Sequence, residues 1–386
     1  MTAYLLIIVL LLYFIFAYDV GHQRQGRKQM QWLVIVLLIL MAGLRYHIGS
    51  DTIGYEDDFN REVPVLSRLS SSQAMMSQPL WIFLMSLCKT WFGSFVAFQF
   101  IHAIILNLLI FRFIRKTTNY VFTALLFIFC ITWWNLSFEV LRESLCVGIY
   151  LNAILLLKKG KYINYAVLGL IMVGLHWFAF LMVIITPFIM YANEKVVYSA
   201  IILGGVALFL FVDTQLFELI DLISADYISG GASKRIDSYL NQDGGQGKVE
   251  FNLIGLIFTF VLYIALPLIT IYFNKEEKGN KNFSKILVLF ILFAVLQTKL
   301  VIFTRFYNYL YIVLIVCFVN ILYDKKIKTP IVRLLFKSLV FILLMNGCWS
   351  FYRPSSSEYR SNIHYNCFYI PYKTIFQDPD PIREAR

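Results

Sequence analysis

Seven ionisable side chains occupy the same kind of position in this sequence, close to one end of a long apolar run. They are Arg45, Glu139, Arg142, Glu143, His176, Lys299 and Arg305. A charge held near hydrocarbon costs at least about 2.5–3.5 kcal/mol unless it is paired or hydrated. Guanidinium groups grip phosphate oxygens with paired hydrogen bonds and stay charged when partly dried. Three arginines from three apolar runs therefore predict a cationic pocket that suits the diphosphate of a phosphorylated lipid.

Each of these residues also has a purely structural interpretation. An arginine such as Arg45 at the end of an apolar helix can anchor that end among lipid headgroups. Glu139, Arg142 and Glu143 are spaced i, i+3 and i+4, which predicts that they share one face of a helix. An ion pair on that face would hold two helices together without any ligand.

His176 is the first candidate for a general base. It stands between Leu175 and Trp177 in an apolar region, where a lone histidine is more often a hydrogen-bonded packing residue. Beside arginines, however, a neutral imidazole is poised to accept a proton at neutral pH. Glu139 and then Asp51 are the next candidates for this role.

The elements that must position these side chains are membrane helices. Of the 386 residues, 59% are hydrophobic and 15% are charged, whereas a soluble domain carries about 25% charged residues. The composition predicts an all-α, polytopic membrane protein in which residues 1–386 form a single membrane domain. The net charge of +11 is spread in short basic clusters between apolar runs, so it predicts topology signals and no nucleic-acid partner.

Charge-free runs of about 17–25 residues are candidate spans. About twelve are expected, near residues 1–18, 30–45, 94–111, 119–136, 140–157, 162–175, 177–192, 196–212, 251–273, 284–301, 304–323 and 334–350. The apolar run after Tyr162 must turn back near His176 for the downstream charges to fit. The run 79–92 is too short for a span and contains Lys89, so it is expected to be a re-entrant or interfacial helix.

The basic residues segregate to one side of this arrangement. Nineteen of the 34 lie on that side with five acidic residues, which leaves fifteen basic and eighteen acidic residues elsewhere. The first side is therefore expected to be cytoplasmic. Segments 46–93, 213–250 and 351–386 then lie on the periplasmic side. The nineteen are Arg24, Arg27, Lys28, Arg112, Arg115, Lys116, Lys158, Lys159, Lys161, Lys195, Lys275, Lys278, Lys281, Lys285, Lys325, Lys326, Lys328, Arg333 and Lys337.

Four motifs resemble those of the EpsG-type branch of the Wzy polysaccharide polymerases. The most specific is Gly43-Leu44-Arg45-Tyr46, followed by Gly49-Ser50-Asp51, Tyr55 and Phe59. The second, Leu141-Arg142-Glu143-Ser144-Leu145, is similar to an arginine-led helix that commonly reads Arg-Gln-x-x-Ala, from which Glu143 and Cys146 depart. Leu175-His176-Trp177 with Pro187 resembles the family's single-histidine helix pair, and Thr304-Arg305-Phe306 with Tyr309 resembles its late Arg-x-x-x-Tyr motif.

The resemblance implies a membrane glycosyltransferase of the bacterial inner membrane. Such an enzyme transfers the growing glycan from undecaprenyl diphosphate to the non-reducing end of a new lipid-linked repeat unit at the periplasmic face. His176, Arg142 and Arg305 are then expected to be catalytic. Arg45, Asp51, Tyr55, Glu139 and Tyr309 are expected to bind substrate. Neither a cofactor nor a metal is expected, and a chain-length regulator protein is a candidate partner beside membrane lipid.

Three other classes compete with this interpretation. A lipid-linked oligosaccharide flippase would also be basic and have about twelve helices, but its charges would be distributed through the bundle interior. A membrane O-acyltransferase would need a histidine that a cytoplasmic acyl donor can reach, and His176 is expected on the opposite side. A non-enzymatic scaffold or chain-length partner would not require buried arginines.

Overall fold

The chain folds into helices. The structure is a computed structural model that describes residues 2–49, 51–71, 78–196, 198–199, 203, 260–274, 281–297, 303–323, 369 and 372–377. Within these ranges there is no strand, and an isolated antiparallel β-bridge pairs Arg45 with Thr374. The all-α fold class is therefore confirmed.

The chain divides into two compact units. The first comprises Met1–Ile185 and Ile315–Arg386, and the second comprises Thr186–Leu314. The first unit contains α1 (Thr2–Phe14), η1 (Ile15–Val20), α2 (Arg27–Gly43), α3 (Thr52–Asp57), η2 (Asp58–Glu62), η3 (Leu66–Ser71), α4 (Pro79–Phe92), α5 (Phe95–Thr117), α6 (Val121–Ile128), η5 (Phe129–Trp133), η6 (Asn135–Glu139), α7 (Leu141–Lys158) and α8 (Tyr162–Leu175). Of the short elements, η1, η2, η5 and η6 are π-helical and η3 is a 3₁₀-helix.

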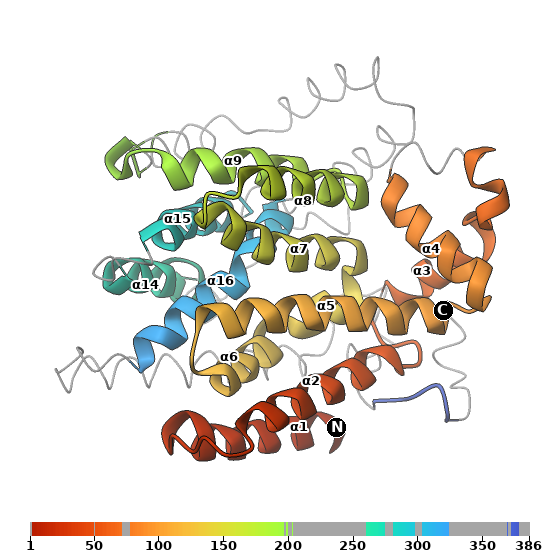
Figure 1. The fold of residues 1–386 in the computed structure, drawn as a ribbon, viewed down its shortest axis with the longest axis horizontal. Coiled ribbons are helices and arrows are strands. Elements are labelled where there is room, and N and C mark those ends of the chain that lie inside the picture. Colours follow the sequence, from red (N-terminus) through yellow and green to blue (C-terminus); the bar gives the residue numbers. More distant parts are fainter. Residues whose placement is uncertain are drawn as a thin grey trace, which may run out of the picture. The chain divides into compact units, whose positions relative to one another are not determined.

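The core of the first unit is a stack of long helices. α2 packs on α5, α5 on α7 and α7 on α8, while α1 packs on α6 (Figure 1). α5 and α7 present buried apolar side chains over most of their length, such as Phe98, Leu106 and Tyr150. α5 is therefore the central helix to which the N-terminal helices and the α7–α8 pair are attached.

The second unit contains the remaining described helices. They are η7 (Val261–Ala265), α14 (Leu266–Asn274) and α15 (Lys281–Leu296), with the first part of α16 (Thr304–Leu322) and the last part of α9 (Ala179–Tyr191). Lys285 donates to the carbonyl oxygens of Met190 at 3.3 Å and Ala192 at 2.7 Å. Its ammonium thus supplies donors to the carbonyl groups that the end of α9 leaves open.

Three helical segments are long and apolar enough to cross a membrane: Ala3–Val20, Phe95–Thr117 and Thr304–Leu322. Shorter apolar helices match other expected spans closely, for example α8 at 162–175. These helices support a membrane protein. The count of twelve spans is not confirmed, because 334–350 and most of 196–212 lie outside the described residues and only the part from 260 onward is described for 251–273.

The short helix expected at 79–92 forms with those bounds as α4. It begins with Pro79 at its first turn and ends before Gly93, whose φ of 63° gives the left-handed cap typical of a helix end. At about 1.5 Å per residue its length is about 21 Å, short of a hydrocarbon core of about 30 Å. Its re-entrant or interfacial placement stays a prediction.

Lys89 of α4 holds the main chain of residues 59–63 by hydrogen bonds. Its ammonium donates to the carbonyl oxygens of Phe59 at 2.7 Å, Asn60 at 2.9 Å and Val63 at 2.7 Å. All three donors of the ammonium group are thereby used. Lys89 is a structural contact between α4 and the end of η2.

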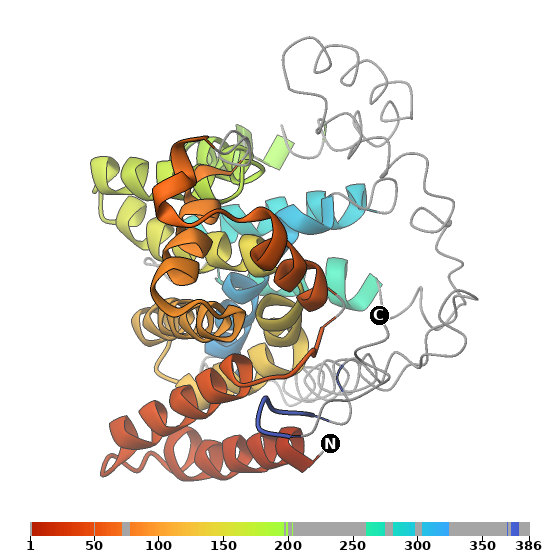
Figure 2. The same ribbon diagram turned by 90° about the vertical axis from the view of Figure 1, so that its right-hand side faces the viewer.

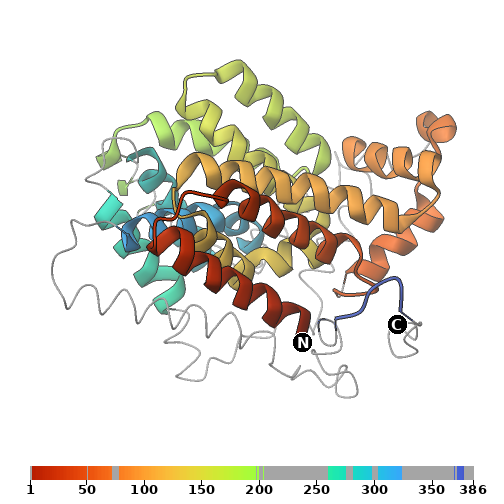
Figure 3. The ribbon, with the colours of Figure 1, turned by 60° about the horizontal axis from the view of Figure 1, so that its bottom comes forward.

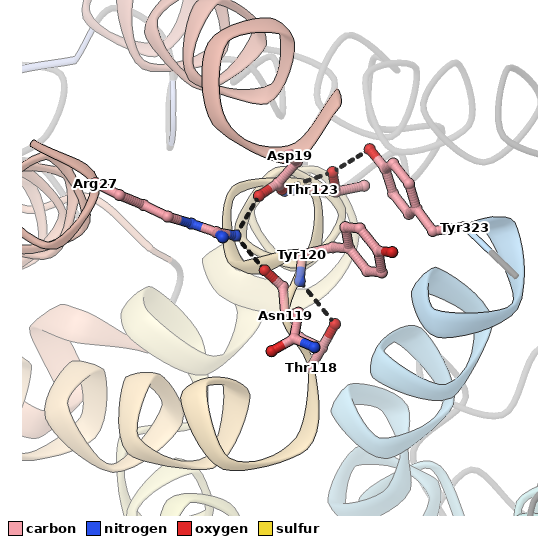
Figure 4. Close-up of polar contacts among 7 residues, drawn as sticks. All are labelled: Asp19, Arg27, Thr118, Asn119, Tyr120, Thr123 and Tyr323. Carbon is pink, nitrogen blue, oxygen red and sulfur yellow. Dashed lines mark hydrogen bonds and ion pairs between the residues drawn. The ribbon is translucent and has the colours of Figure 1, made fainter. Parts of the chain in front are cut away.

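The buried carboxylate of Asp19 connects several helices at the end of the first unit that is expected to be cytoplasmic. Asp19 accepts a hydrogen bond from Arg27 at 3.0 Å and two from Thr123, at 2.8 Å from the main-chain nitrogen and 2.9 Å from the hydroxyl. The Thr123 hydroxyl also lies 2.8 Å from the Tyr323 hydroxyl, and Tyr323 stacks on Tyr120 (Figure 4). Through Asp19, η1 is joined to α2, α6 and the segment that follows α16.

Replacing Asp19 by asparagine is expected to lower stability by about 1–3 kcal/mol, because the amide loses the charge and leaves buried donors imperfectly paired. The apparent melting temperature of the purified protein in detergent would measure this. Asp57→Asn is the matched control, since the Asp57 side chain is 54% exposed and lies 3.6 Å from Arg61. Equal melting temperatures for the two variants would contradict the prediction that Asp19 stabilises the fold.

Candidate functional site

The backbone around Arg45 is held tightly by α5. A Cβ placed on Gly43 would lie 2.3 Å from the Phe100 ring, so α2 can approach α5 this closely because the residue is glycine. The Gln99 amide donates to the carbonyl oxygens of Gly43 at 2.9 Å and Arg45 at 3.0 Å. α5 therefore fixes the point where the chain leaves α2 and enters residues 45–59, which are called the polar segment below.

The Arg45 side chain is buried, with 1% of its surface exposed. Its Nε donates to the carbonyl oxygen of Ile48 at 3.3 Å and its Nη1 donates to that of Ala42. The guanidinium carbon lies 5.2 Å from the centre of the Phe138 ring. Among the described residues Nη2 has no hydrogen-bond partner. The arginine is thus not a snorkelling side chain, and its Nη2 amino group is available for a further contact.

The segment after Arg45 wraps around Phe138. Gly49 has φ of 102°, and a Cβ there would lie 2.3 Å from the Phe138 carbonyl oxygen. Glycine is therefore required both by the backbone conformation and by the close approach of Phe138. The Thr52 hydroxyl lies 2.6 Å from the Ile48 carbonyl oxygen and 3.2 Å from that of Phe138. These contacts bring the exposed Asp51 to the end of η6.

Glu139 lies at the centre of the site. One carboxylate oxygen accepts a hydrogen bond from the Asp51 main-chain nitrogen at 3.2 Å, and the other accepts one from the Tyr369 hydroxyl. Arg45 interacts electrostatically with the same carboxylate. Glu139 therefore joins the polar segment, the end of η6 and the C-terminal part of the chain.

The expectation that Glu139, Arg142 and Glu143 share one helix face is wrong. Glu139 ends η6, Val140 leaves the helical conformation with φ of −93° and ψ of 58°, and α7 begins at Leu141. Arg142 and Glu143 are in the first turn of α7. The break gives Glu139 and Arg142 different directions, which lets each contact a different part of the polar segment.

Arg142 lies over Tyr55. Its guanidinium carbon is 5.5 Å from the centre of the Tyr55 ring, and its Nη1 donates to the Gln78 side chain at 2.9 Å. Burial raises the pKa of the Tyr55 phenol, and the positive charge of Arg142 opposes that shift. The phenol is therefore neutral at physiological pH and acts as a hydrogen-bonding group. Arg142 is half-buried, so part of its surface is exposed to solvent.

His102 fixes the start of α7. Its Nε2 lies 2.9 Å from the Leu141 carbonyl oxygen and 3.1 Å from the Ser144 hydroxyl. The carbonyl can only accept, so Nε2 carries a proton in this contact. Three residues earlier on α5, Gln99 holds Arg45. One helix thus sets the positions of both Arg45 and Arg142.

His176 lies at the predicted turn, which is confirmed between α8 and α9. Its backbone is extended, with φ of −155° and ψ of 113°, and its ring centre is 5.5 Å from that of Phe178. A Cβ on Gly174 would lie 2.8 Å from the Leu80 side chain, so the end of α8 packs on the start of α4 next to Gln78. The imidazole is buried, and its role as a base stays a prediction.

Arg305 and Tyr309 are in the second unit. Arg305 is the second residue of α16 and is half-exposed, whereas Tyr309 is buried. Their assignment to the same site as Arg142 stays a prediction. Lys299 lies outside the described residues.

Five of the eight candidate residues are thus connected through contacts in the first unit: Arg45, Asp51, Tyr55, Glu139 and Arg142. Four residues that hold them were not among the candidates predicted from sequence: Gln78, Gln99, His102 and Tyr369. Gln99 and His102 carried a signal, because two polar residues spaced i, i+3 within an apolar run mark a buried polar contact.

In the part of the chain that the structure describes, no group of three or more His, Cys, Asp or Glu side chains is placed to hold a metal ion. The expectation that the reaction needs no metal stays a prediction.

Comparison with known proteins identifies one family. The EpsG family model matches residues 30–374, which is most of the chain and includes all eight candidate residues. No curated protein and no solved structure matches the chain. The match confirms the family resemblance that the four motifs indicate.

Proposed function

This chain belongs to the EpsG family, and on that premise we propose that it polymerises lipid-linked oligosaccharide repeat units at the periplasmic face of the bacterial inner membrane. Family membership indicates a function like that of polysaccharide polymerases, and the apolar helices indicate a membrane protein. The observation that carries the finer proposal is the connection of Arg45 and Glu139 to Arg142 through Asp51 and Tyr55 in the first unit. The substrate in this proposal is an undecaprenyl-diphosphate-linked glycan.

The arginines would act on the leaving group. When the bond between the anomeric carbon and the diphosphate breaks, its electron pair goes to the diphosphate oxygen, where negative charge develops. Preorganised guanidinium donors stabilise that charge without reorganisation. Arg142 is half-buried and has donors beyond the one that Gln78 uses, which supports it as a diphosphate ligand. Arg305 is proposed as a second ligand from the family motif.

The acceptor is a hydroxyl on the non-reducing sugar of a new repeat unit. Its oxygen forms the new glycosidic bond to the anomeric carbon of the growing chain, and its proton passes to a base. We assign that base to His176. Glu139 and Asp51, with Tyr55 and Tyr309, would accept or donate hydrogen bonds to sugar hydroxyls. The products are the lengthened glycan on the new carrier and free undecaprenyl diphosphate.

The purified protein is expected to lengthen lipid-linked repeat units that have been extracted from a strain lacking this gene. Electrophoresis would show a ladder of longer lipid-linked glycans with release of the diphosphate carrier. A flippase, the competing class, would carry single units across a vesicle bilayer without changing their length. Single units that persist in the presence of folded protein would therefore contradict polymerisation. A chain-length regulator is proposed as a partner that shapes the ladder.

The periplasmic placement of the site predicts which residues a membrane-impermeant thiol reagent reaches in spheroplasts. Gly54→Cys should react, because a side chain there meets open space, whereas the exposed Lys159 position should react as cysteine only after the membrane is permeabilised. The described native cysteines, Cys88, Cys130, Cys146 and Cys317, are buried and should give little background. Cys348 and Cys367 are replaced by serine. Labelling of Lys159→Cys in intact spheroplasts would overturn the topology.

A further inference from the structure

The C-terminal residues that the structure describes, 369 and 372–377, form a docked segment that contacts the polar segment containing Arg45. The Tyr46 main-chain nitrogen donates to the Lys373 carbonyl at 3.0 Å, and the Ile375 nitrogen donates to the Leu44 carbonyl at 3.1 Å. These two bonds flank the bridge between Arg45 and Thr374. Figures 2 and 3 show this dark-blue segment beside the N-terminal end of α1 and the end of α2. Residues about 330 positions apart thus form one local structure.

Tyr369 reaches from this segment into the site. It is buried, and its ring centre lies 6.1 Å from that of Phe138 and 6.0 Å from that of Trp134. Its own carbonyl oxygen accepts a hydrogen bond from the Tyr4 hydroxyl at 2.7 Å. The Phe138 and Trp134 rings pack against the Tyr369 ring, and the hydrogen bond from Tyr4 holds its main chain. These contacts fix the position of the Tyr369 hydroxyl, which donates to Glu139.

The Glu139 carboxylate is held from two distant parts of the chain. The residue ends η6, next to the break at Val140. The Asp51 nitrogen contacts one oxygen and Tyr369 contacts the other. A carboxylate fixed at both oxygens beside a buried guanidinium has its orientation set before a substrate arrives.

We propose that Tyr369 is a positioning residue for Glu139, which makes the docked C-terminal segment a component of the substrate site. This inference rests on the proposed function, in which Glu139 binds sugar hydroxyls of the lipid-linked unit. Because Tyr369 acts through a binding residue, its hydroxyl contributes to substrate affinity and has little part in the chemical step.

The test is the steady-state elongation of lipid-linked units by the purified Tyr369→Phe variant. Loss of a hydrogen bond to a charged group should raise KM about tenfold. The kcat should stay within about twofold, because the lost interaction stabilises the bound substrate and the transition state equally. Tyr13→Phe is the matched control outside the docked segment, since Tyr13 on α1 is 66% exposed. Its KM should equal that of the parent.

Two further variants separate positioning from a loss of folding. Glu139→Ala combined with Tyr369→Phe should be no worse than Glu139→Ala alone, because each change removes the hydrogen bond between the Tyr369 hydroxyl and the carboxylate. Tyr4→Phe loosens the Tyr369 main chain and should raise KM in the same direction. Unchanged KM in both Tyr369→Phe and Tyr4→Phe, or full additivity in the double variant, would overturn the inference. A parent protein that elongates no lipid-linked unit would instead overturn the proposed function, and this inference with it.

Discussion

The Arg142→Lys variant is expected to lose most of its polymerising activity, with a rate lower by about 10²–10³-fold, the loss typical when one preorganised donor to a developing negative charge is removed. Lysine keeps the charge but not the planar fork that binds a phosphate through two parallel hydrogen bonds. It also cannot bond Gln78 and a phosphate in the geometry that the guanidinium provides. The elongation rate of purified protein measures the effect, with protein abundance and melting temperature checked.

Arg115→Lys is a close control for this substitution. The Arg115 guanidinium carbon lies 5.5 Å from the centre of the Phe111 ring, the same distance that separates Arg142 from Tyr55. Arg115 is exposed in the last turn of α5, where the expected topology is cytoplasmic. It should tolerate lysine with near-normal activity. If Arg142→Lys is equally active, Arg142 is a structural anchor for Gln78 and the diphosphate assignment fails.

Replacing His176 by glutamine is expected to slow transfer about as much as replacing it by alanine, by about 10²–10⁴-fold, because general base catalysis requires an ionisable group. Glutamine keeps hydrogen-bonding capacity without basicity. The substitution therefore separates proton transfer from packing or donor contact. Both variants should fold and bind lipid-linked substrate, so the loss should fall on kcat.

His22→Gln provides the reference for the histidine substitution. His22 is exposed between η1 and α2, far in sequence from the proposed site, and should give parental rates. A His176→Gln rate within about threefold of the parent would show that no rate-limiting proton transfer depends on the imidazole. The base would then be Glu139 or Asp51, and the fixed carboxylate of Glu139 would be tested first.

The sequence specified the helices well where chemistry changes abruptly along the chain. The run 162–175 is free of charge and lies between Lys161 and His176, and it forms α8 with those bounds. α4 is bounded by Pro79 and Gly93, two residues that mark helix ends for separate physical reasons. The positions of several spans could therefore be predicted because charge, proline and glycine interrupt the apolar runs.

The contacts within the site could not be predicted in the same way. The break at Val140 occurs at an aliphatic residue without glycine or proline, so periodicity placed Glu139 and Arg142 on one helix. The partners Gln78 and Tyr369 come from segments distant in sequence, and tertiary packing alone brings them to Arg142 and Glu139. Residue types indicated which side chains bind charge, but the geometry depended on contacts that no local pattern encodes.

The π-helical turns have a consequence for insertions and deletions. A π-turn holds one residue more than an α-turn, and each residue in a helix rotates the following side chains by about 100°. η1 carries the buried Asp19 and η6 carries the buried Glu139, so one residue fewer in either helix would rotate the acid away from its present contacts. Losing one residue from η6 would restore α-helical winding and turn Glu139 away from Asp51. The chain length between Trp134 and Val140 is therefore as much a requirement of the site as the identity of its charged residues.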